Sequence, residues 1–332
     1  MENILTLRPV SQQVVKANVD TGISTVSTNS PIIVANTVEG NFNEIKNNHI
    51  IPVFVKDNST LISHYDFIDV TAEIAATVFS GEKLLSPSIR LSHPIKGRIP
   101  DARDKPAHLL QEHEKTLYYE RMAFAIEIPT IHEDIDGNTL SLTVGGVKAY
   151  SQDNLSARKG ADEHFKIYIG FQNRVCTNLC VSTDGFMNDV KVSSLGHLKA
   201  CLTTLFENYN ASYSLHTLKD FAQYSVREEQ FAHLIGRCRM YPFLPKKLQA
   251  EIPQLLFGDT QLGMVVRDYY RDESFCKGSD GNINLWKMYN LFTGANKSTY
   301  IDMFLERSVN AFQFIHGLKD ALRLGGNNWY LS

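Results

Sequence analysis

The segment Leu140-Ser141-Leu142-Thr143-Val144 alternates apolar and polar residues, and segments with the composition of strands stand on both sides of it. Residues 117–128 before it are aromatic and β-branched, and residues 165–181 after it form two similar runs around Gln172-Asn173. A period of two places successive side chains on opposite faces of a strand. These segments therefore predict an antiparallel meander of about four strands, with a hairpin turn at residues 134–138.

Beyond the strand segments, apolar residues recur every three or four positions, which is typical of helices. Ser194 is a favourable N-cap for the first of them. Ser225 and Glu228 have the spacing of a capping box and predict a second helix that ends at Gly236. Further helices are expected to begin near Pro245, Gln261, Leu285 and Thr299. The last should end at Gly325, so the fold class is α+β, with a helical C-terminal half.

The N-terminal residues lack a regular apolar pattern. Residues 1–46 are rich in Asn, Thr, Ser and Val, and they predict a flexible arm that orders only where it docks. A hairpin is predicted at residues 50–63, with an apolar run at 50–55 as its first strand and residues 60–63 as its second. An apolar stripe from Phe67 to Val78 follows, and it predicts a helix behind a capping box that begins at Ser63.

The length of 332 residues allows about two domains or one large one. We expect the arm at residues 1–46 and a mainly β region with one early helix at 47–192. A helical region at 193–325 should pack on it, either as a second domain or as part of one continuous domain. The chain has 33 Lys and Arg against 36 Asp and Glu, a net charge of −3. This balance argues against a protein that is basic throughout.

The cellular location is suggested by what the sequence lacks. The N-terminus does not resemble a signal peptide, and the apolar runs are shorter than the roughly 20 residues of a membrane helix. Five scattered cysteines are an odd number and do not form a disulfide framework. We therefore expect a cytoplasmic protein that does not contact a membrane.

Motifs for common cofactors do not occur in the sequence. It contains no dinucleotide-binding, P-loop, α/β-hydrolase, zincin or zinc-ribbon pattern, so we expect neither a cofactor nor a metal. Cys176 and Cys180 would lie about 13 Å apart on one face of a strand, which is too far for one zinc ion. The favoured interpretation is two core residues. The alternative is a nucleophilic Cys176 assisted by His164 or His197.

A second catalytic alternative involves the polar segment at residues 108–114. His108 and Glu112 would share one face of a helix, next to His113, but a third metal ligand is not evident. A solvated polar face is the favoured interpretation. A metal-dependent hydrolase or nuclease that uses these residues is the alternative. The acidic segment at 134–138 lacks the downstream Glu of a calcium loop and is expected to be a turn.

The segment with the most suggestive charge is residues 86–106, which holds four prolines and is expected to be a long irregular loop. Arginine side chains suit phosphate oxygens, and neighbouring aromatic residues can stack on bases. The candidate nucleic-acid site consists of Arg90, Lys96, Arg98, Arg103, Lys105, Arg121 and Arg174. A solvated loop with local ion pairs is the alternative. A smaller basic cluster follows a predicted helix at Arg237, Arg239, Lys246 and Lys247.

Several segments resemble the family called domain of unknown function 3871, which is uncharacterised and common in gut Bacteroidetes and their mobile elements. They include His93-Pro94-Ile95-Lys96-Gly97-Arg98, Gly170-Phe171-Gln172-Asn173-Arg174-Val175-Cys176-Thr177-Asn178 and Asn284-Leu285-Trp286-Lys287-Met288-Tyr289-Asn290. The resemblance covers residues from about 45 to 322. More distantly, the Arg-Val-Cys-Thr-Asn and Leu-Trp-x-x-Tyr-Asn segments look like the phage/plasmid-like proteins of prophages and plasmids. The resemblance implies no catalytic residues.

Taken together, the charge of the loop and the resemblance favour an accessory protein of a mobile element. We expect it to contact nucleic acid or a DNA-processing protein through the loop at residues 90–105 and the adjacent strands. The hydrolase or nuclease is one alternative. A structural protein-interaction module, with the N-terminal arm exchanged between copies, is the other. The sequence leaves the oligomeric state open.

Overall fold

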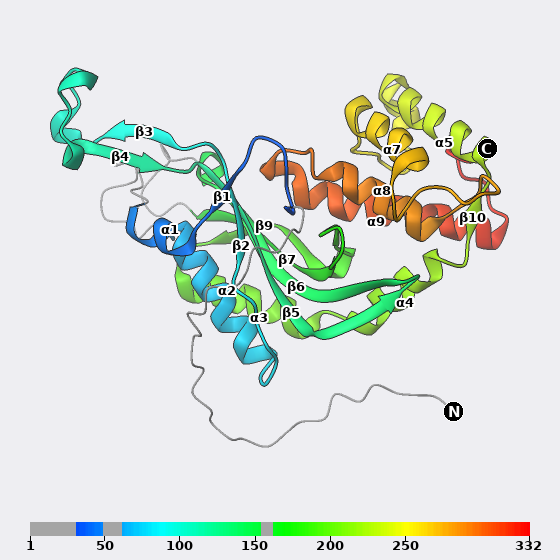
Figure 1. The fold of residues 1–332 in the computed structure, drawn as a ribbon, viewed down its shortest axis with the longest axis horizontal. Helices are drawn as coiled ribbons and strands as arrows, with labels where there is room; N and C mark the ends of the chain where they lie inside the picture. The colour runs from blue at the N-terminus through cyan, green and yellow to red at the C-terminus, as the bar shows by residue number, and fades with distance from the viewer. Residues whose placement is uncertain (1–30, 49–61, 154–161) are drawn as a thin grey trace.

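The computed structural model describes residues 31–48, 62–153 and 162–332 (Figure 1). Its centre is a curled antiparallel sheet in the order β1-β2-β5-β6-β7-β8, with β9 also paired to β7. The strands are β1 Val38–Gly40, β2 Ser88–Leu91, β5 Arg121–Ile135, β6 Asn138–Ala149, β7 Glu163–Asn173, β8 Leu179–Cys180 and β9 Phe186–Val192. None of the helices in these ranges combines the length and apolarity that a membrane span requires.

Helices cover both faces of this sheet. On one face lie α2 His64–Val78 and α3 Leu195–Asn208, and on the other lies α9 Ile301–Leu324 (Figure 1). The ring of Phe67 meets the rings of Phe124 and Phe165 edge-on, at centroid distances of 5.0 and 4.8 Å. Across the sheet, Phe304 of α9 joins a second apolar cluster with Ala123 of β5. The central strands are therefore buried on both sides.

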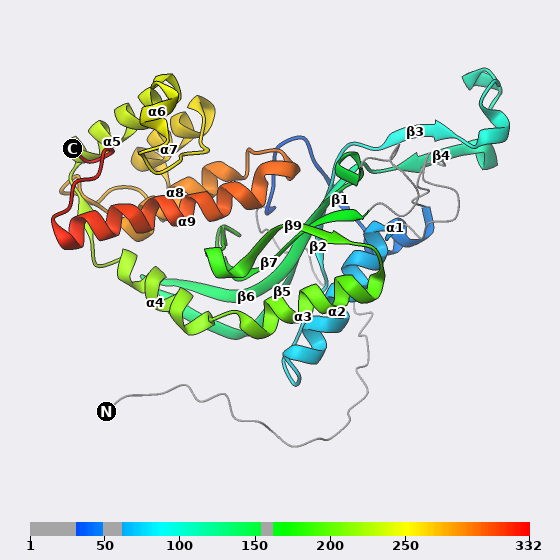
Figure 2. The same cartoon turned by 180° about the vertical axis from the view of Figure 1, so that it is seen from behind.

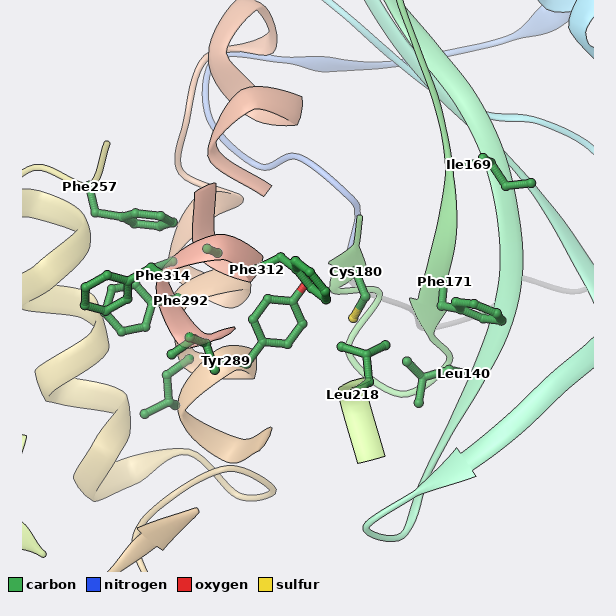
Figure 3. Close-up of a cluster of buried hydrophobic side chains, with 14 of the residues drawn as sticks. Leu140, Ile169, Phe171, Cys180, Leu218, Phe257, Tyr289, Phe292, Phe312 and Phe314 are labelled. Atoms are coloured by element: carbon green, nitrogen blue, oxygen red, sulfur yellow. The ribbon is translucent and has the colours of Figure 1, made fainter. Parts of the chain in front are cut away.

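Most of the remaining helices pack against one another or against α9 (Figure 2). They are α4 Ala211–Phe221, α5 Glu228–Met240, α6 Lys246–Gln249, α7 Asp259–Arg271 and α8 Leu285–Asn296. A two-stranded ladder of β10 Ser225–Val226 and β11 Ile283–Asn284 ties the start of α5 to the start of α8. Figure 3 shows one continuous apolar cluster from Phe171 in the sheet to Tyr289 and Phe312 in the helices. The two regions thus share a core.

The α+β prediction and its antiparallel meander are confirmed. The hairpin between β5 and β6 turns at Asp136-Gly137, where both residues have positive φ (48° and 77°) as a type I′ turn requires. Ser63 forms the predicted capping box with Asp66, because its hydroxyl accepts from the Asp66 N–H while the Asp66 carboxylate accepts from the Ser63 N–H. The cap at Ser194 is also confirmed. Helix α9 ends at a left-handed Gly325, as predicted.

Three details of the expectation are wrong. Ser225 pairs with Asn284 in the small ladder, and α5 begins instead behind Arg227, whose N–H donates to the Gln230 side chain. Helix α5 continues through Gly236 to Met240. The turn expected at Gln172-Asn173 lies at residues 174–177, because β7 runs through Asn173. The first and third errors arose where pairing with another segment replaced or extended a local signal.

The end of the predicted arm is also corrected. Residues 31–48 are ordered on the body: Ile32 and Ile33 are buried, and the N–H groups of Val34 and Ala35 donate to the Lys297 carbonyl. This segment continues into β1 and α1 Phe42–Asn48. The hairpin expected at residues 50–63 lies almost entirely outside the described residues.

The prediction of an irregular loop at residues 86–106 is wrong as well. Its first part is β2, an interior strand of the sheet, and its second part is β3 Ile95–Arg98. Strand β3 pairs with β4 Lys115–Tyr118, so the predicted strand at 117–128 is divided between β4 and β5. Three short 3₁₀ turns connect the pair: η1 Pro100–Ala102, η2 Ala107–Leu109 and η3 Glu112–Glu114.

Candidate functional site

The most distinctive part of the molecule is the hairpin at residues 92–119, which we call the finger. Strands β3 and β4 pair antiparallel from Ile95↔Tyr118 to Arg98↔Lys115 in a two-stranded sheet of their own. Both views show the finger extending away from the seven-stranded sheet (Figures 1 and 2). Isolated two-stranded hairpins are marginally stable in water. Contacts within the finger are therefore needed to hold it together.

Two of the predicted site residues hold the tip of the finger together. The guanidinium of Arg98 donates from Nη1 to the carbonyl oxygens of Arg103 and Lys105. The ammonium of Lys105 lies 2.7 Å from a Glu114 carboxylate oxygen, and this hydrogen bond lowers the pKa of Glu114. Arg98 and Lys105 thus have structural partners across the 3₁₀ turns.

Two other predicted residues present their charges to solvent. Lys96 is exposed on β3, and Arg103 lies 3.5 Å from Asp104. The side chains of Arg103 and Asp104 are 81% and 91% exposed, and ion pairs this exposed are worth little. The apolar Leu109, 55% exposed, lies in the turns near them. Lys96 and Arg103 are therefore the predicted cations that remain available to an anionic partner.

The finger as a whole is nearly neutral. Its five cations are offset by four acids, because the returning segment at residues 107–119 adds two acids and only one cation. The cations are Lys96, Arg98, Arg103, Lys105 and Lys115, and the acids are Asp101, Asp104, Glu112 and Glu114. Any attraction for phosphate must come from the few exposed cations rather than from the total charge.

The other three predicted residues lie on the body. Arg90, on β2, donates from Nε to the Thr37 hydroxyl at 3.0 Å and from Nη2 to the Thr37 carbonyl, also at 3.0 Å. These hydrogen bonds hold the segment that precedes β1 in position. Burial lowers the pKa of the Arg90 guanidinium. Arg121 pairs at 2.9 Å with Asp302 at the start of α9. Both guanidinium groups therefore join parts of the fold.

Arg174 lies in the turn after β7 and points to the middle of β5. It donates from Nη2 to the Pro129 carbonyl at 2.8 Å and pairs with Glu127 at 3.2 Å. Because Glu127 is six residues along β5 from Arg121, the two arginines are separated by about 20 Å of strand. The seven residues predicted as one site are thus divided between the finger and separate places on the body.

The residues of the hydrolase alternative are not arranged on a helix. His108 belongs to η2 and Glu112 to η3, and the exposed Glu112 pairs with Lys115 at 2.5 Å. The hydrogen bond from Lys115 lowers the pKa of Glu112. Within the part of the chain that the structure describes, no three His, Cys, Asp or Glu side chains are grouped to hold a metal ion.

The two cysteines occupy different elements. Cys180 is buried on β8, whereas Cys176 is half-buried in the preceding turn, where Thr177 has a positive φ of 56°. The expectation that both fill one face of a strand is therefore wrong for Cys176. Burial raises the pKa of both thiols, which favours the unreactive protonated form. His164, one proposed assistant, bonds to Asp189 at 2.6 Å.

The turn that contains Cys176 also makes a contact that the sequence did not reveal. The Asn178 amide donates to the carbonyl oxygen of Asn290 on α8 at 3.0 Å. The Lys297 ammonium, just beyond α8, donates to the Thr177 hydroxyl at 2.9 Å and to the Cys176 carbonyl. The segments at residues 174–178 and 285–290, on which the phage/plasmid-like resemblance rests, are therefore in contact in the folded chain. Their separation by more than one hundred residues hides this contact from local patterns.

The buried Lys297 predicts a measurable pH dependence. Burial lowers its pKa from 10.5 to about 8, so between these values the unfolded chain holds a proton that the folded chain has released. Raising the pH through this window should stabilise the native protein relative to Lys297→Met, by up to about 1.4 kcal/mol per pH unit. Urea unfolding of both proteins between about pH 7 and 10 measures the difference. A difference that stays constant across this range would contradict the assignment.

Comparisons with known proteins identify a family and nothing more specific. The model of the family described as "Domain of unknown function, B. Theta Gene description (DUF3871)" matches residues 13–331, nearly the whole chain. No curated protein and no solved structure matches the chain.

Proposed function

The chain belongs to the DUF3871 family, and on that premise we propose that it is an accessory protein of a mobile element that binds duplex DNA through the finger. The observation that carries the proposal is a two-stranded ribbon that extends from the body and presents Lys96 and Arg103. The major groove of B-DNA admits a ribbon of this kind, and exposed cations reach the phosphates beside it. The association with mobile elements, and action in the cytoplasm, rest on the family resemblance and the sequence.

The small number of available cations defines how such binding should behave. Each phosphate neutralised releases counterions, and the slope of log K against log salt is about −0.9 per contact on duplex DNA. With Lys96, Arg103 and Lys115 as the exposed cations of the finger, we expect a slope of about −2 to −3. Such binding is weak at physiological salt and suits a protein that acts alongside a stronger DNA-binding partner.

Reversing two charges on the finger should weaken this binding. Lys96→Glu combined with Arg103→Glu removes two phosphate contacts and adds repulsion, so affinity for duplex DNA should fall at least about tenfold at low salt. The salt slope should also become shallower by about 2. Fluorescence anisotropy with a labelled duplex, titrated at several salt concentrations, measures both quantities. Arg98 is left unchanged because it holds the tip.

The matched control is Lys83→Glu combined with Arg271→Glu. Both residues are exposed on the body, away from the finger, and the pair alters the net charge by the same amount. It should therefore bind nearly as well as the unmodified chain. Equal losses in the two double variants would mean that only total charge matters. Absence of duplex binding by the unmodified chain at low salt would reject the proposal.

A further inference from the structure

An exposed apolar and cationic surface surrounds the turn η6 Tyr241–Phe243, which links α5 to α6. We call residues 239–248 the turn patch. The ring of Phe243 is 84% exposed, and Met240 and Leu248 beside it are 55% and 46% exposed. Single exposed apolar residues are ordinary, but here three of them stand within nine residues around one turn. The finger plays no part in it, because the two lie at opposite ends of the molecule (Figures 1 and 2).

The turn that presents Phe243 is held in place by hydrogen bonds from the Gln249 side chain. The Gln249 amide nitrogen lies 3.1, 3.1 and 2.9 Å from the carbonyl oxygens of Tyr241, Pro242 and Leu244. Tyr241 itself is buried, with its ring 6.2 Å from that of Tyr330. Proline at 242 fixes the backbone further. The phenylalanine therefore faces solvent on a fixed support, and its ordering costs little when a ligand binds.

The charged residues within the turn patch itself are all positive. Residues 230–250 contain no acidic residue, while Arg239, Lys246 and Lys247 are exposed in the turn patch. Arg239 has a partner in Asp259 at 3.5 Å, but both side chains are more than half exposed and the pair is weak. Arg237 does not contribute, because it lies over the Trp329 ring and donates to the C-terminal residue Ser332. The patch thus combines one aromatic ring with three cations.

We propose that the turn patch binds single-stranded nucleic acid, with a base stacked on Phe243 and phosphates near Arg239, Lys246 and Lys247. Aromatic platforms flanked by cations are the means by which proteins bind single strands without sequence preference. We favour a base over an acidic peptide or a lipid surface, because a ring that is 84% exposed can stack on a base while the neighbouring cations meet its phosphates. This site is independent of the duplex site proposed for the finger.

The test uses the full chain and a fluorescein-labelled oligothymidylate of about 30 nucleotides at low salt. Phe243→Ala should weaken binding about tenfold or more, and Phe243→Trp should retain it, because indole also stacks on bases. Lys247→Ala should make the salt slope shallower by about 0.7, the value for one contact on a single strand. Tyr300→Ala removes an aromatic ring that is 60% exposed elsewhere and should have no effect.

The outcomes separate this proposal from the one for the finger. Unchanged binding by Phe243→Ala would overturn the turn patch, as would a Phe243-dependent affinity for anionic vesicles or acidic peptides without affinity for the oligonucleotide. If the finger variant loses duplex binding and Phe243→Ala keeps single-strand binding, the finger is supported and the turn patch is rejected. If Phe243→Ala loses single-strand binding, the turn patch is supported, whatever the finger variant does to duplex binding. Loss in one assay therefore does not decide the other.

Discussion

Replacement of Lys148 by methionine should lower the free energy of unfolding by about 3–5 kcal/mol, because it removes one partner from a buried charge cluster. The ammonium is fully buried on β6 and lies 3.0 Å from Asp153 and 2.7 Å from Glu163. It also lies 3.9 Å from the centre of the Phe165 ring. Without it, two carboxylates would remain buried without their cation.

The same variant should have an altered pH dependence. Burial already raises the pKa of Glu163, and loss of the ammonium should raise it further. A carboxyl group whose pKa is raised in the folded state favours folding at low pH and opposes it as the pH rises. The loss in free energy of unfolding caused by Lys148→Met should therefore be larger at pH 8 than at about pH 5. Urea unfolding at both pH values measures it.

A surface ion pair provides the comparison for this result. Lys191 lies 3.3 Å from Asp189, and both side chains are more than half exposed. Lys191→Met should change stability by no more than about 1 kcal/mol. Adding Glu163→Gln and Asp153→Asn to Lys148→Met should recover part of the loss, since neutral groups are cheaper to bury. Equal effects of Lys148→Met and Lys191→Met would show that the buried cluster contributes nothing special.

The second large effect is expected at Tyr289, which joins the helices to the sheet. Its ring is fully buried on α8, 5.7 Å from the Phe221 ring and 6.4 Å from that of Phe312. Figure 3 shows it directed toward Cys180 on β8. Tyr289→Ala should cost about 3–5 kcal/mol through lost burial and the cavity left behind. Unfolding should remain a single transition, because one core extends through both regions.

A conservative variant tests whether packing is the cause. The Tyr289 hydroxyl is buried beside the Cys180 thiol, which is only a weak hydrogen-bond partner. Tyr289→Phe should therefore change stability by less than about 1 kcal/mol, or increase it slightly. Circular dichroism and tryptophan fluorescence should follow the same curve in chemical unfolding. Two separated transitions in Tyr289→Ala would instead show that the strand and helical regions unfold independently.

The elements that the sequence predicted correctly are those set by local chemistry. The capping box at Ser63, the cap at Ser194 and the glycine stop at Gly325 each act through a backbone group within a few residues. The Asp136-Gly137 turn is likewise decided by two adjacent residues. Contacts of this kind leave a signature in any single sequence.

The errors came from pairing between distant segments. Prolines around residues 94–106 indicated an irregular loop, but Pro94 precedes β3 and leaves its ladder with β4 intact. The serine at 225 fits a capping box, yet its pairing with Asn284 prevails. Lys148 shares the strand face of Leu142 and Val144, where the alternation predicts an apolar residue, yet it is buried there with acidic partners. The alternation of residues in one strand does not specify which helices cover each face of the sheet.

The candidate site was only partly accessible to sequence reasoning. Charge and residue type marked the finger and the basic turn at 237–247, but not which cations have partners. Arg90 and Arg121 bond to groups that are far away in the chain. For the turn patch, a usable signal was present: a phenylalanine between two prolines, followed by two lysines, in a stretch of about twenty residues without an acid.

The separateness of the finger has a consequence for how this family can diversify. Because β3 and β4 pair in a sheet of their own, residues 95–118 can lengthen, shorten or be replaced without disturbing the register of the seven-stranded sheet. Insertions are tolerated best at such projecting hairpins. Relatives can therefore differ in the finger while they keep the same scaffold.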